Sequence, residues 1–252
     1  MTSVLGDLSV SRIGFGGRWL SDPEHSRTLL HRALELGVTL IDTADVYGNS
    51  EEIIAQALRP YPDDLVIATK GGQTHVEGRP TADGRPEYLR AACERSLTKL
   101  RVESIDLYQL HMPDPNVPIE DSIGALDELR REGKIRHFGV SNVFGDQLEA
   151  ALRTAPIVSV QNRYSLMNRD SEHEIEICER EGIAFMPWQP LADGALASIA
   201  GPQVALAWLL QRSPAMLPIP GTTSIEHLEE NVTAAGLRLT ADEVAALDAQ
   251  VR

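Results

Sequence analysis

The sequence predicts an α/β protein, specifically a (β/α)8 TIM barrel. Short apolar runs alternate with longer amphipathic runs along the whole chain. The short runs are apolar throughout rather than at every second residue, which is typical of parallel strands buried on both faces. Eight strand–helix units in 252 residues match such a barrel in number and in length. A doubly wound parallel sheet is the alternative arrangement.

An N-terminal β-hairpin over Val4–Ser11 precedes these units and is expected to plug the bottom of the barrel. The strands that follow should end at one rim, where barrel enzymes carry their functional groups. The eight expected barrel strands are Ile13–Gly17, Thr39–Thr43, Leu65–Lys70, Ile105–His111, Ile135–Asn142, Ile157–Arg163, Ala184–Pro190 and Met216–Pro220.

Runs with helical period follow the strands, and local signals mark several of their ends. Asp22-Pro23 starts the first helix with Pro in its first turn, and Gly37 follows its end. Gly182 follows the sixth helix, and Thr240–Glu243 forms a capping box before the last. The expected helices are Glu24–Leu36, Ser50–Leu58, Pro86–Leu100, Ile119–Arg131, Phe144–Leu152, Ser171–Glu181, Pro202–Gln211 and Thr240–Val251.

A short extra helix is expected after the eighth strand, because Thr223–Glu226 fits a capping box. The free N–H groups at its start would attract a phosphate, and an ordinary capped surface helix is the alternative. No linker rich in Pro, Gly or Ser divides the chain. We therefore expect a single domain over residues 1–252.

The composition restricts the classes of partner. Lys and Arg total 23 and Asp and Glu total 37, which gives a net charge of −14. Such a chain repels nucleic-acid phosphates and anionic lipid headgroups, so neither is an expected partner. Cys93 and Cys178 are too few and too far apart for a disulfide framework, and we expect two free thiols. A cytoplasmic protein is expected, because no basic leader or long apolar run is present. A monomer is also expected.

Four ionisable residues follow three neighbouring strands. Asp42 and Tyr47 come after the second expected strand, Lys70 ends the third and His111 ends the fourth. Lys70 is one of only three lysines, and its buried stem requires a partner for the ammonium group, which Asp42 could supply. A cation beside Tyr47 would stabilise its phenolate and assist proton transfer, while His111 could orient a carbonyl oxygen. An ordinary network of rim salt bridges is the alternative.

These strand ends resemble the aldo-keto reductase family from about Ile13 to the C-terminus. The stretches that carry the resemblance are IDTADVYG (41–48), IATKGG (67–72), IDLYQLHMPD (105–114), GVSN (139–142), VQNRYS (160–165), PWQPLADG (187–194) and IPGTTSIEHLEEN (219–231). The resemblance implies reduction of aldehyde or ketone carbonyls to alcohols by NADPH. It also implies a catalytic tetrad of Asp42, Tyr47, Lys70 and His111, with Tyr47 as the proton donor.

The resemblance further implies a dinucleotide bound across the top of the barrel without a Rossmann fold. Its nicotinamide would be held by Ser141, Asn142 and Gln161 and stacked on Trp188. Alone, Ser141 and Asn142 would suit a cap for the fifth helix, and Trp188 would suit packing. The remaining implied cofactor contacts are Gln189, Pro190, Leu191, Gly221, Thr222, Thr223, Ser224, His227, Glu230 and Asn231, and the candidate substrate contacts are Trp19 and Met112.

Two positions depart from a common pattern of the family. Many members have Lys where this chain has Gly221 and Arg where it has His227, and those cations usually hold the 2′-phosphate of NADP. NADPH remains the expected cofactor, with NADH as the alternative. Two rival functions stay open: a cofactor-bound regulatory subunit with little turnover, and a metal-dependent barrel hydrolase. No metal site is expected, because no metal-ligand spacing such as H-E-x-x-H is present.

Overall fold

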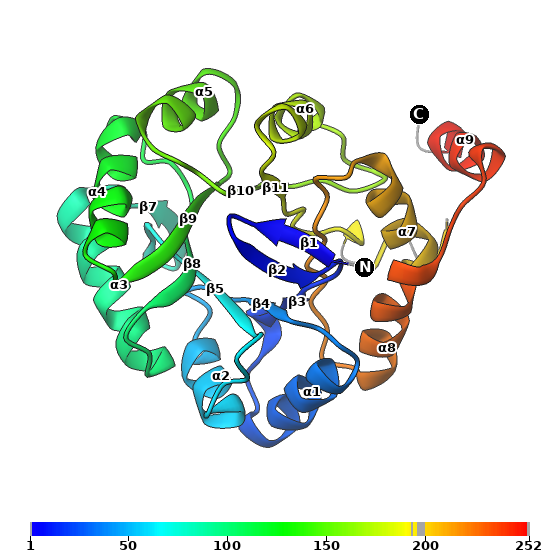
Figure 1. The fold of residues 1–252 in the computed structure, drawn as a ribbon, viewed down its shortest axis with the longest axis horizontal. Helices are drawn as coiled ribbons and strands as arrows, with labels where there is room; N and C mark the ends of the chain where they lie inside the picture. Colours follow the sequence, from blue (N-terminus) through cyan, green and yellow to red (C-terminus); the bar gives the residue numbers. More distant parts are fainter. Residues whose placement is uncertain (1, 193, 196–199, 251–252) are drawn as a thin grey trace.

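Parallel strands form a curled sheet at the centre of the computed structural model, which describes residues 2–192, 194–195 and 200–250 (Figure 1). Seven strands of the described chain pair in the order β11-β10-β9-β8-β5-β4-β3, and every pairing is parallel. They are β3 (Phe15–Gly16), β4 (Leu40–Asp42), β5 (Val66–Gly71), β8 (Ile105–Leu110), β9 (Ile135–Ser141), β10 (Ser159–Gln161) and β11 (Ala184–Phe185). The expected barrel is confirmed, although several strands are shorter than the apolar runs that predict them.

The segment 214–220 closes the ring between β11 and β3. Leu217 N–H donates to the carbonyl of Phe185 at 2.8 Å, and Gly14 and Gly16 donate to Pro218 and Pro220 at 2.9 and 3.1 Å. The expected strand Met216–Pro220 is therefore present as a closing segment, with one isolated bridge rather than a regular strand. The reason is chemical, since a proline has no N–H to donate to a ladder.

Helices surround the ring and cover the outer faces of the strands, except that the last described helix lies outside this layer (Figure 1). They are α1 (Pro23–Glu35), α2 (Ser50–Leu58), α3 (Pro86–Leu100), α4 (Ile119–Arg131), α5 (Gly145–Thr154), α6 (Glu172–Glu181), α7 (Pro202–Arg212), α8 (Ile225–Thr233) and α9 (Ala241–Gln250), with 3-10 turns η1 (Gly17–Trp19) and η3 (Ala234–Gly236). All expected helices are present to within a few residues; the last residue of the expected final helix, 251, lies outside the described chain. Within that chain, no helix is long and apolar enough to cross a membrane.

Three of the predicted helix caps are present in the structure. Asp22 accepts a hydrogen bond from the N–H of His25 at 2.7 Å at the start of α1. Gly182 ends α6 in the left-handed conformation. The N–H of Thr240 donates to Glu243 and the N–H of Glu243 donates to Thr240, as a capping box requires. Local sequence chemistry therefore fixes these helix ends before any tertiary contact is considered.

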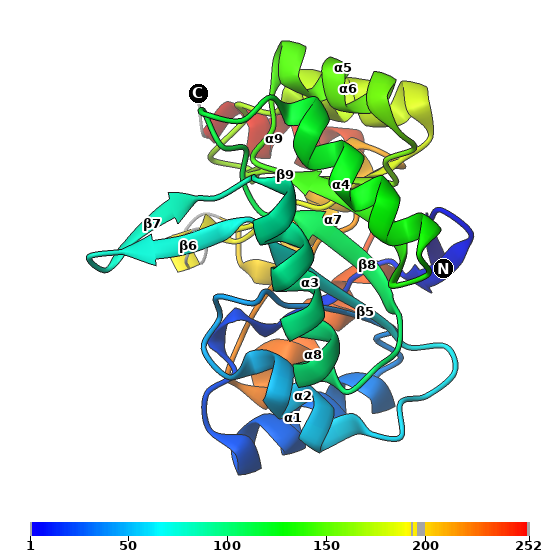
Figure 2. The ribbon, with the colours of Figure 1, turned by 90° about the vertical axis from the view of Figure 1, so that its left-hand side faces the viewer.

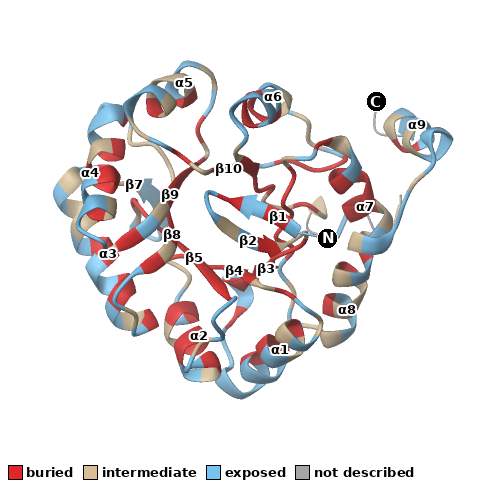
Figure 3. Cartoon of the chain, in the orientation of Figure 1, coloured by how far each residue is buried: buried red, intermediate tan, exposed pale blue. Residues whose placement is uncertain are grey.

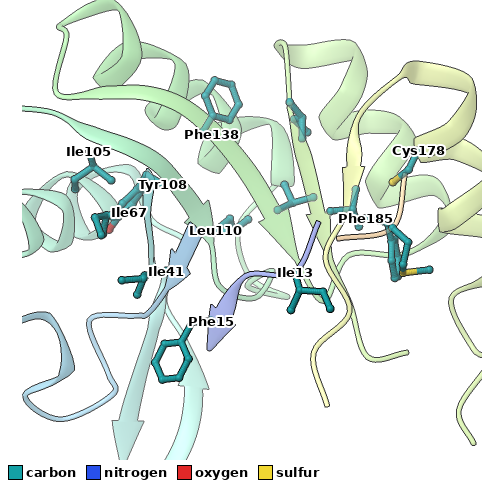
Figure 4. Close-up of a cluster of buried hydrophobic side chains, with 14 of the residues drawn as sticks. Ile13, Phe15, Ile41, Ile67, Ile105, Tyr108, Leu110, Phe138, Cys178 and Phe185 are labelled. Carbon is teal, nitrogen blue, oxygen red and sulfur yellow. The ribbon is translucent and has the colours of Figure 1, made fainter. Parts of the chain in front are cut away.

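Alternation along each strand separates two apolar layers. Outward-facing side chains such as Ile41, Ile67 and Phe138 pack beneath the helices in one large cluster (Figure 4). Burial follows the same division, with the buried residues of the helices on the side that faces the sheet (Figure 3). The inward-facing side chains Leu40 and Val66 belong to a second, smaller cluster inside the ring.

The N-terminal hairpin fills one end of the ring. Strands β1 (Thr2–Leu5) and β2 (Leu8–Ser11) pair antiparallel and lie across the centre of the barrel in Figure 1. Leu5 and Val10 are fully buried in the same inner cluster as Leu40 and Val66. The expected plug is confirmed, and the lower interior of the barrel is consequently filled by apolar side chains.

A second hairpin was not expected from the sequence. Strands β6 (Gln73–Val76) and β7 (Arg79–Ala82) pair antiparallel and project from the barrel between β5 and α3 (Figure 2). Glu77 and Gly78 form its turn with positive φ of 50° and 76°, the geometry of a two-residue type I′ turn. Only Gln73 of this hairpin faces the site described next.

Candidate active site

The upper interior of the barrel is polar, because the same strands that begin with apolar inward residues end with polar ones. On β4, Asp42 comes two residues after Leu40, and on β5, Lys70 comes four residues after Val66. Side chains at even spacings on a strand share one face. Gln109 on β8 and Gln161 on β10 also hydrogen-bond at this level. The period of two along each strand thus places charged and amide side chains next to one another, above the apolar layer that the N-terminal hairpin fills.

Lys70 and Asp42 form a buried ion pair. The ammonium donates to Asp42 Oδ2 at 2.6 Å and to the carbonyl of Thr43 at 2.9 Å, and the Lys70 side chain is fully buried. Gln109 and Gln161 donate to the other carboxylate oxygen at 3.2 and 3.0 Å. The pairing expected from the sequence is present, and the surrounding donors offset the cost of burying two charges.

The electrostatics of Lys70 follow from this pairing. Burial by itself lowers the pKa of Lys70, but Asp42 and then Tyr47 more than offset that effect, so the pKa lies above its ordinary value. The side chain therefore stays cationic at neutral pH. Its ammonium nitrogen lies 5.2 Å from the centroid of the Tyr47 ring. A fixed positive charge is thus held beside the phenol.

Tyr47 and His111 meet above the ion pair. Their rings pack edge to face with centroids 5.7 Å apart. Burial lowers the pKa of His111 well below its usual value, and the nearby Lys70 and Arg18 lower it further. The imidazole is therefore neutral at physiological pH. The four strand-end residues that the sequence singles out converge on one place in the structure.

A chain of hydrogen bonds joins the residues implied for the nicotinamide end. Ser141 Oγ donates to the carbonyl of Gln161 at 2.7 Å, and Asn142 Nδ2 donates to the carbonyl of His111 at 3.0 Å. Trp188 Nε1 donates to Asn142 Oδ1 at 3.1 Å. Neither Ser141 nor Asn142 caps α5, whose N-cap residue is Phe144, so a plain capping role for this pair is wrong.

One cavity of about 780 Å³ lies over these residues. It is lined by most of the residues expected at the site, namely Trp19, Asp42, Tyr47, His111, Ser141, Asn142, Gln161, Trp188, Gln189, Pro190, Leu191, Gly221, Thr222, His227 and Asn231. Five expected residues do not line it: Lys70 lies beneath the surface, and Met112, Thr223, Ser224 and Glu230 are outside the lining. Thr223 borders a smaller neighbouring hollow together with Trp19 and Gly221.

The start of α8 differs slightly from the expected capping box. Ser224, not Thr223, is the N-cap residue, and its hydroxyl accepts from the N–H of His227 at 3.3 Å. Thr222 in turn accepts from the N–H of Ser224 at 3.0 Å. The Ser224 hydroxyl is therefore occupied in capping the start of the helix, while Thr222 and His227 line the cavity.

Asn231, one turn further along α8, has an unmatched polar atom. The residue is only 2% exposed, lines the cavity, and its Oδ1 has no hydrogen-bond partner in the described chain. A buried amide oxygen without a donor carries a free-energy penalty until a donor is supplied. This atom fits an exocyclic amine or hydroxyl group of a ligand that extends along the cavity to α8.

The closing segment also approaches β3 very closely. A Cβ added to Gly221 would lie 2.9 Å from the carbonyl oxygen of Gly16, and one added to Gly16 would lie 2.7 Å from the carbonyl oxygen of Ile219. Any side chain at Gly221 would therefore push these two backbones apart. The absence of a lysine here has a structural reason within this chain.

Sequence reasoning missed several polar residues of the site. Gln109 and Ser159 complete the network beneath Asp42, and Ser159 Oγ donates to Gln109 at 3.2 Å. Both share strand parity with predicted residues, since Gln109 is two positions before His111 and Ser159 two before Gln161, and that spacing could have found them. Arg18 and Gln73 also line the cavity and were not expected there.

Asp45, which follows β4, and Glu51, on α2, form a pair of carboxylates outside the lining of the cavity. Burial raises the pKa of Asp45 to about 7, and the nearby Glu51 acts in the same direction. Glu51 is 1% exposed and accepts a hydrogen bond from Thr69 at 2.7 Å. One oxygen of Asp45 has no partner in the described chain. The ionised carboxylate of Asp45 is thus destabilised in the folded protein.

We expect Asp45→Asn to stabilise the protein increasingly as the pH rises from about 5.5 to about 8. Folding raises the pKa of Asp45 from 3.8 to about 7. Between these two pH values the folded state binds a proton that the unfolded state has released, so the stability of the wild type falls as the pH rises. One pKa unit equals about 1.4 kcal/mol, so the gain should be on the order of 2 kcal/mol larger at the higher pH. Urea unfolding of wild type, Asp45→Asn and the exposed control Asp63→Asn measures this. Equal gains at both pH values would refute it.

Comparison with known proteins adds the family context. Residues 12–202 and 197–252 match the sequence profile of the Aldo/keto reductase family. An uncharacterized oxidoreductase of Schizosaccharomyces pombe is 44% identical, over 98% of this chain and 89% of that protein. Pyridoxine 4-dehydrogenase of Escherichia coli is 38% identical, over 98% and 97%. A solved aldo-keto reductase from Klebsiella pneumoniae in complex with NADPH is 29% identical, with a TM-score of 0.85 over 99% of this chain and 94% of that one.

Proposed function

The chain belongs to the aldo/keto reductase family, and from that premise we propose that it reduces aldehyde or ketone carbonyls to alcohols with a nicotinamide dinucleotide. The observation that carries the proposal is the convergence of Tyr47, His111 and the buried Lys70–Asp42 pair beneath one cavity. A phenol beside a fixed cation and a neutral imidazole can protonate an oxygen as negative charge develops on it.

NADPH is the proposed cofactor, and when bound it supplies a hydride to the carbonyl carbon. Ser141, Asn142 and Gln161 offer hydroxyl and amide groups suited to a carboxamide, and Trp188 offers a ring face. The unmatched Asn231 oxygen on α8, which also belongs to the lining, suits the adenosine part. The NADPH complex of the Klebsiella pneumoniae relative supports this choice, and NADH is the alternative.

Each protein group has a distinct part in the proposed reaction. The hydroxyl of Tyr47 donates its proton to the carbonyl oxygen, and the cation of Lys70 stabilises the phenolate that remains. Asp42 holds the ammonium in place and keeps the buried pair neutral overall. His111, being neutral, can donate a hydrogen bond to the same oxygen without carrying charge into the site.

The direct test follows the ultraviolet absorbance of NADPH, and separately of NADH, during incubation with a panel of aldehydes, ketones and pyridoxal-like carbonyls. Pyridoxal is included because one relative is a pyridoxine dehydrogenase. We expect absorbance to fall with several members of the panel, with alcohol as the product. Tight cofactor binding without turnover on any member would instead favour a regulatory subunit.

We expect His227→Arg to tighten NADPH binding about ten-fold and to leave NADH binding nearly unchanged. His227 lines the cavity at the start of α8, and a guanidinium there could make a charge-assisted hydrogen bond to the 2′-phosphate that NADH lacks. Quenching of protein fluorescence during titration with each cofactor measures both affinities. His173→Arg adds the same charge at an exposed position on α6 and is the control. An equal gain for both cofactors would mean that the 2′-phosphate lies elsewhere.

A further inference from the structure

An arginine lies at the mouth of the cavity, next to the proposed proton donor. Arg18 belongs to η1, the turn that follows β3, and its side chain is exposed and lines the cavity. The guanidinium carbon is 5.3 Å from the ring centroid of Trp19 and 5.7 Å from that of Tyr47. The cation is thus held between two aromatic rings, a few ångströms from the site of chemistry.

Arg18 supplies the uncompensated charge of this region. Asp42 lines the same cavity, but Lys70 neutralises it at 2.6 Å. His111 is neutral, because burial lowers its pKa. In the described part of the chain no carboxylate forms an ion pair with Arg18, although many other arginines are paired. A chain with a net charge of −14 therefore presents a local positive charge beside Tyr47.

We propose that Arg18 selects carbonyl substrates that carry an anionic group, a carboxylate in the simplest case, within a few bonds of the reacting carbonyl. A guanidinium held over aromatic rings keeps its N–H edge available for a planar, bidentate acceptor. The short distance to Tyr47 limits how far the anion can lie from the carbonyl oxygen. This inference rests on the proposed carbonyl reduction and names the substrate class of the same site.

Two other roles for Arg18 are distinguishable. If its charge mainly assisted Tyr47, removing it would slow all substrates alike and shift the pH profile. If it mainly bound the cofactor diphosphate, removing it would weaken cofactor binding. Selection of an anionic substrate predicts neither pattern. It predicts a loss that depends on the charge of the substrate, that falls mainly on KM, and that shrinks as salt screens the interaction.

The test compares 3-carboxybenzaldehyde with its methyl ester, which keeps the ring and the aldehyde but removes the charge. We expect wild type to prefer the carboxylate, and Arg18→Gln to lower the ratio of the two kcat/KM values by about 10- to 100-fold. Arg18→Lys should restore part of the ratio. Arg27→Gln, an exposed arginine on α1 outside the cavity lining, should leave the ratio at the wild-type value. Fluorescence titration with NADPH accompanies each variant.

A binding measurement without turnover completes the design. Thermal stabilisation of the protein by 3-(hydroxymethyl)benzoate, the alcohol product, should be lost in Arg18→Gln and kept in Arg27→Gln. An unchanged ratio, or an equal loss of NADPH affinity, would overturn the assignment of Arg18 to the substrate. If no carbonyl is reduced by wild type, the proposed function fails, while the thermal shift still decides whether Arg18 binds the anion.

Discussion

Tyr47→Phe should lower kcat by about 10²- to 10⁴-fold, the usual contribution of a general acid. The change removes only the hydroxyl, so the ring can keep its contacts with His111 and with Arg18. Cofactor affinity should be nearly unchanged, because other residues are proposed to hold the nicotinamide. Steady-state kinetics with a good substrate and fluorescence titration with NADPH measure the two effects separately.

A matched variant controls for the loss of a tyrosine hydroxyl elsewhere. Tyr61 donates its hydroxyl to the carbonyl of Leu100 at 2.9 Å and does not line the cavity. Tyr61→Phe should therefore reduce stability slightly and leave kcat near the wild-type value. If Tyr47→Phe reduced good substrates at wild-type rates, Tyr47 would not be the proton donor.

Lys70→Met should abolish most activity and also destabilise the protein. The substitution keeps the buried stem and deletes the charge, which leaves Asp42 as a carboxylate that is only 4% exposed. Breaking a buried pair by removing one partner typically costs about 3–5 kcal/mol. We expect a loss of that order in the free energy of unfolding, measured by urea denaturation, together with a collapse of kcat.

Two further variants distinguish the effect of the Lys70 charge on activity from its effect on stability. The double variant Asp42→Asn with Lys70→Met also removes the unpaired carboxylate. Compared with Lys70→Met alone, it should recover much of the free energy of unfolding but none of the activity. Lys134→Met deletes a lysine that is paired with Glu94 and Glu132 at the surface, where the same change should have little effect on either quantity. Full activity with an unaltered pH profile in Lys70→Met would argue against the proposed role of the pair.

Local sequence chemistry predicts the order of elements and much of the site. Apolar runs mark the strands because both faces are buried, and polar residues at the ends of some runs, such as Asp42 and Lys70, face the upper interior. The Lys70–Asp42 pair follows from that logic, since a buried ammonium requires a carboxylate nearby. The start of α1 is equally local, because Asp22 caps it with its own side chain.

Other features depend on contacts between residues that are distant in the sequence, which local patterns do not predict. The hairpin β6–β7 has an Arg-Pro in its second strand and few apolar residues, so its sequence resembles a loop. The closing segment is irregular because two prolines fall on its ladder positions. In the sequence Arg18 is indistinguishable from an ordinary surface arginine, and only the folded barrel places its guanidinium beside the Tyr47 ring.

The joint between the first and last parts of the ring has a consequence for motion. Gly14 and Gly16 supply both of its backbone hydrogen bonds on the β3 side, and Pro218 and Pro220 can donate none in return. Fewer bonds must break there than along β8 and β9, so the ring should open more easily at this joint than between those two strands. Gly221 and Thr222 follow it directly and line the cavity. A ligand that contacts both Thr222 and Tyr47 would therefore brace a joint that two backbone hydrogen bonds hold together.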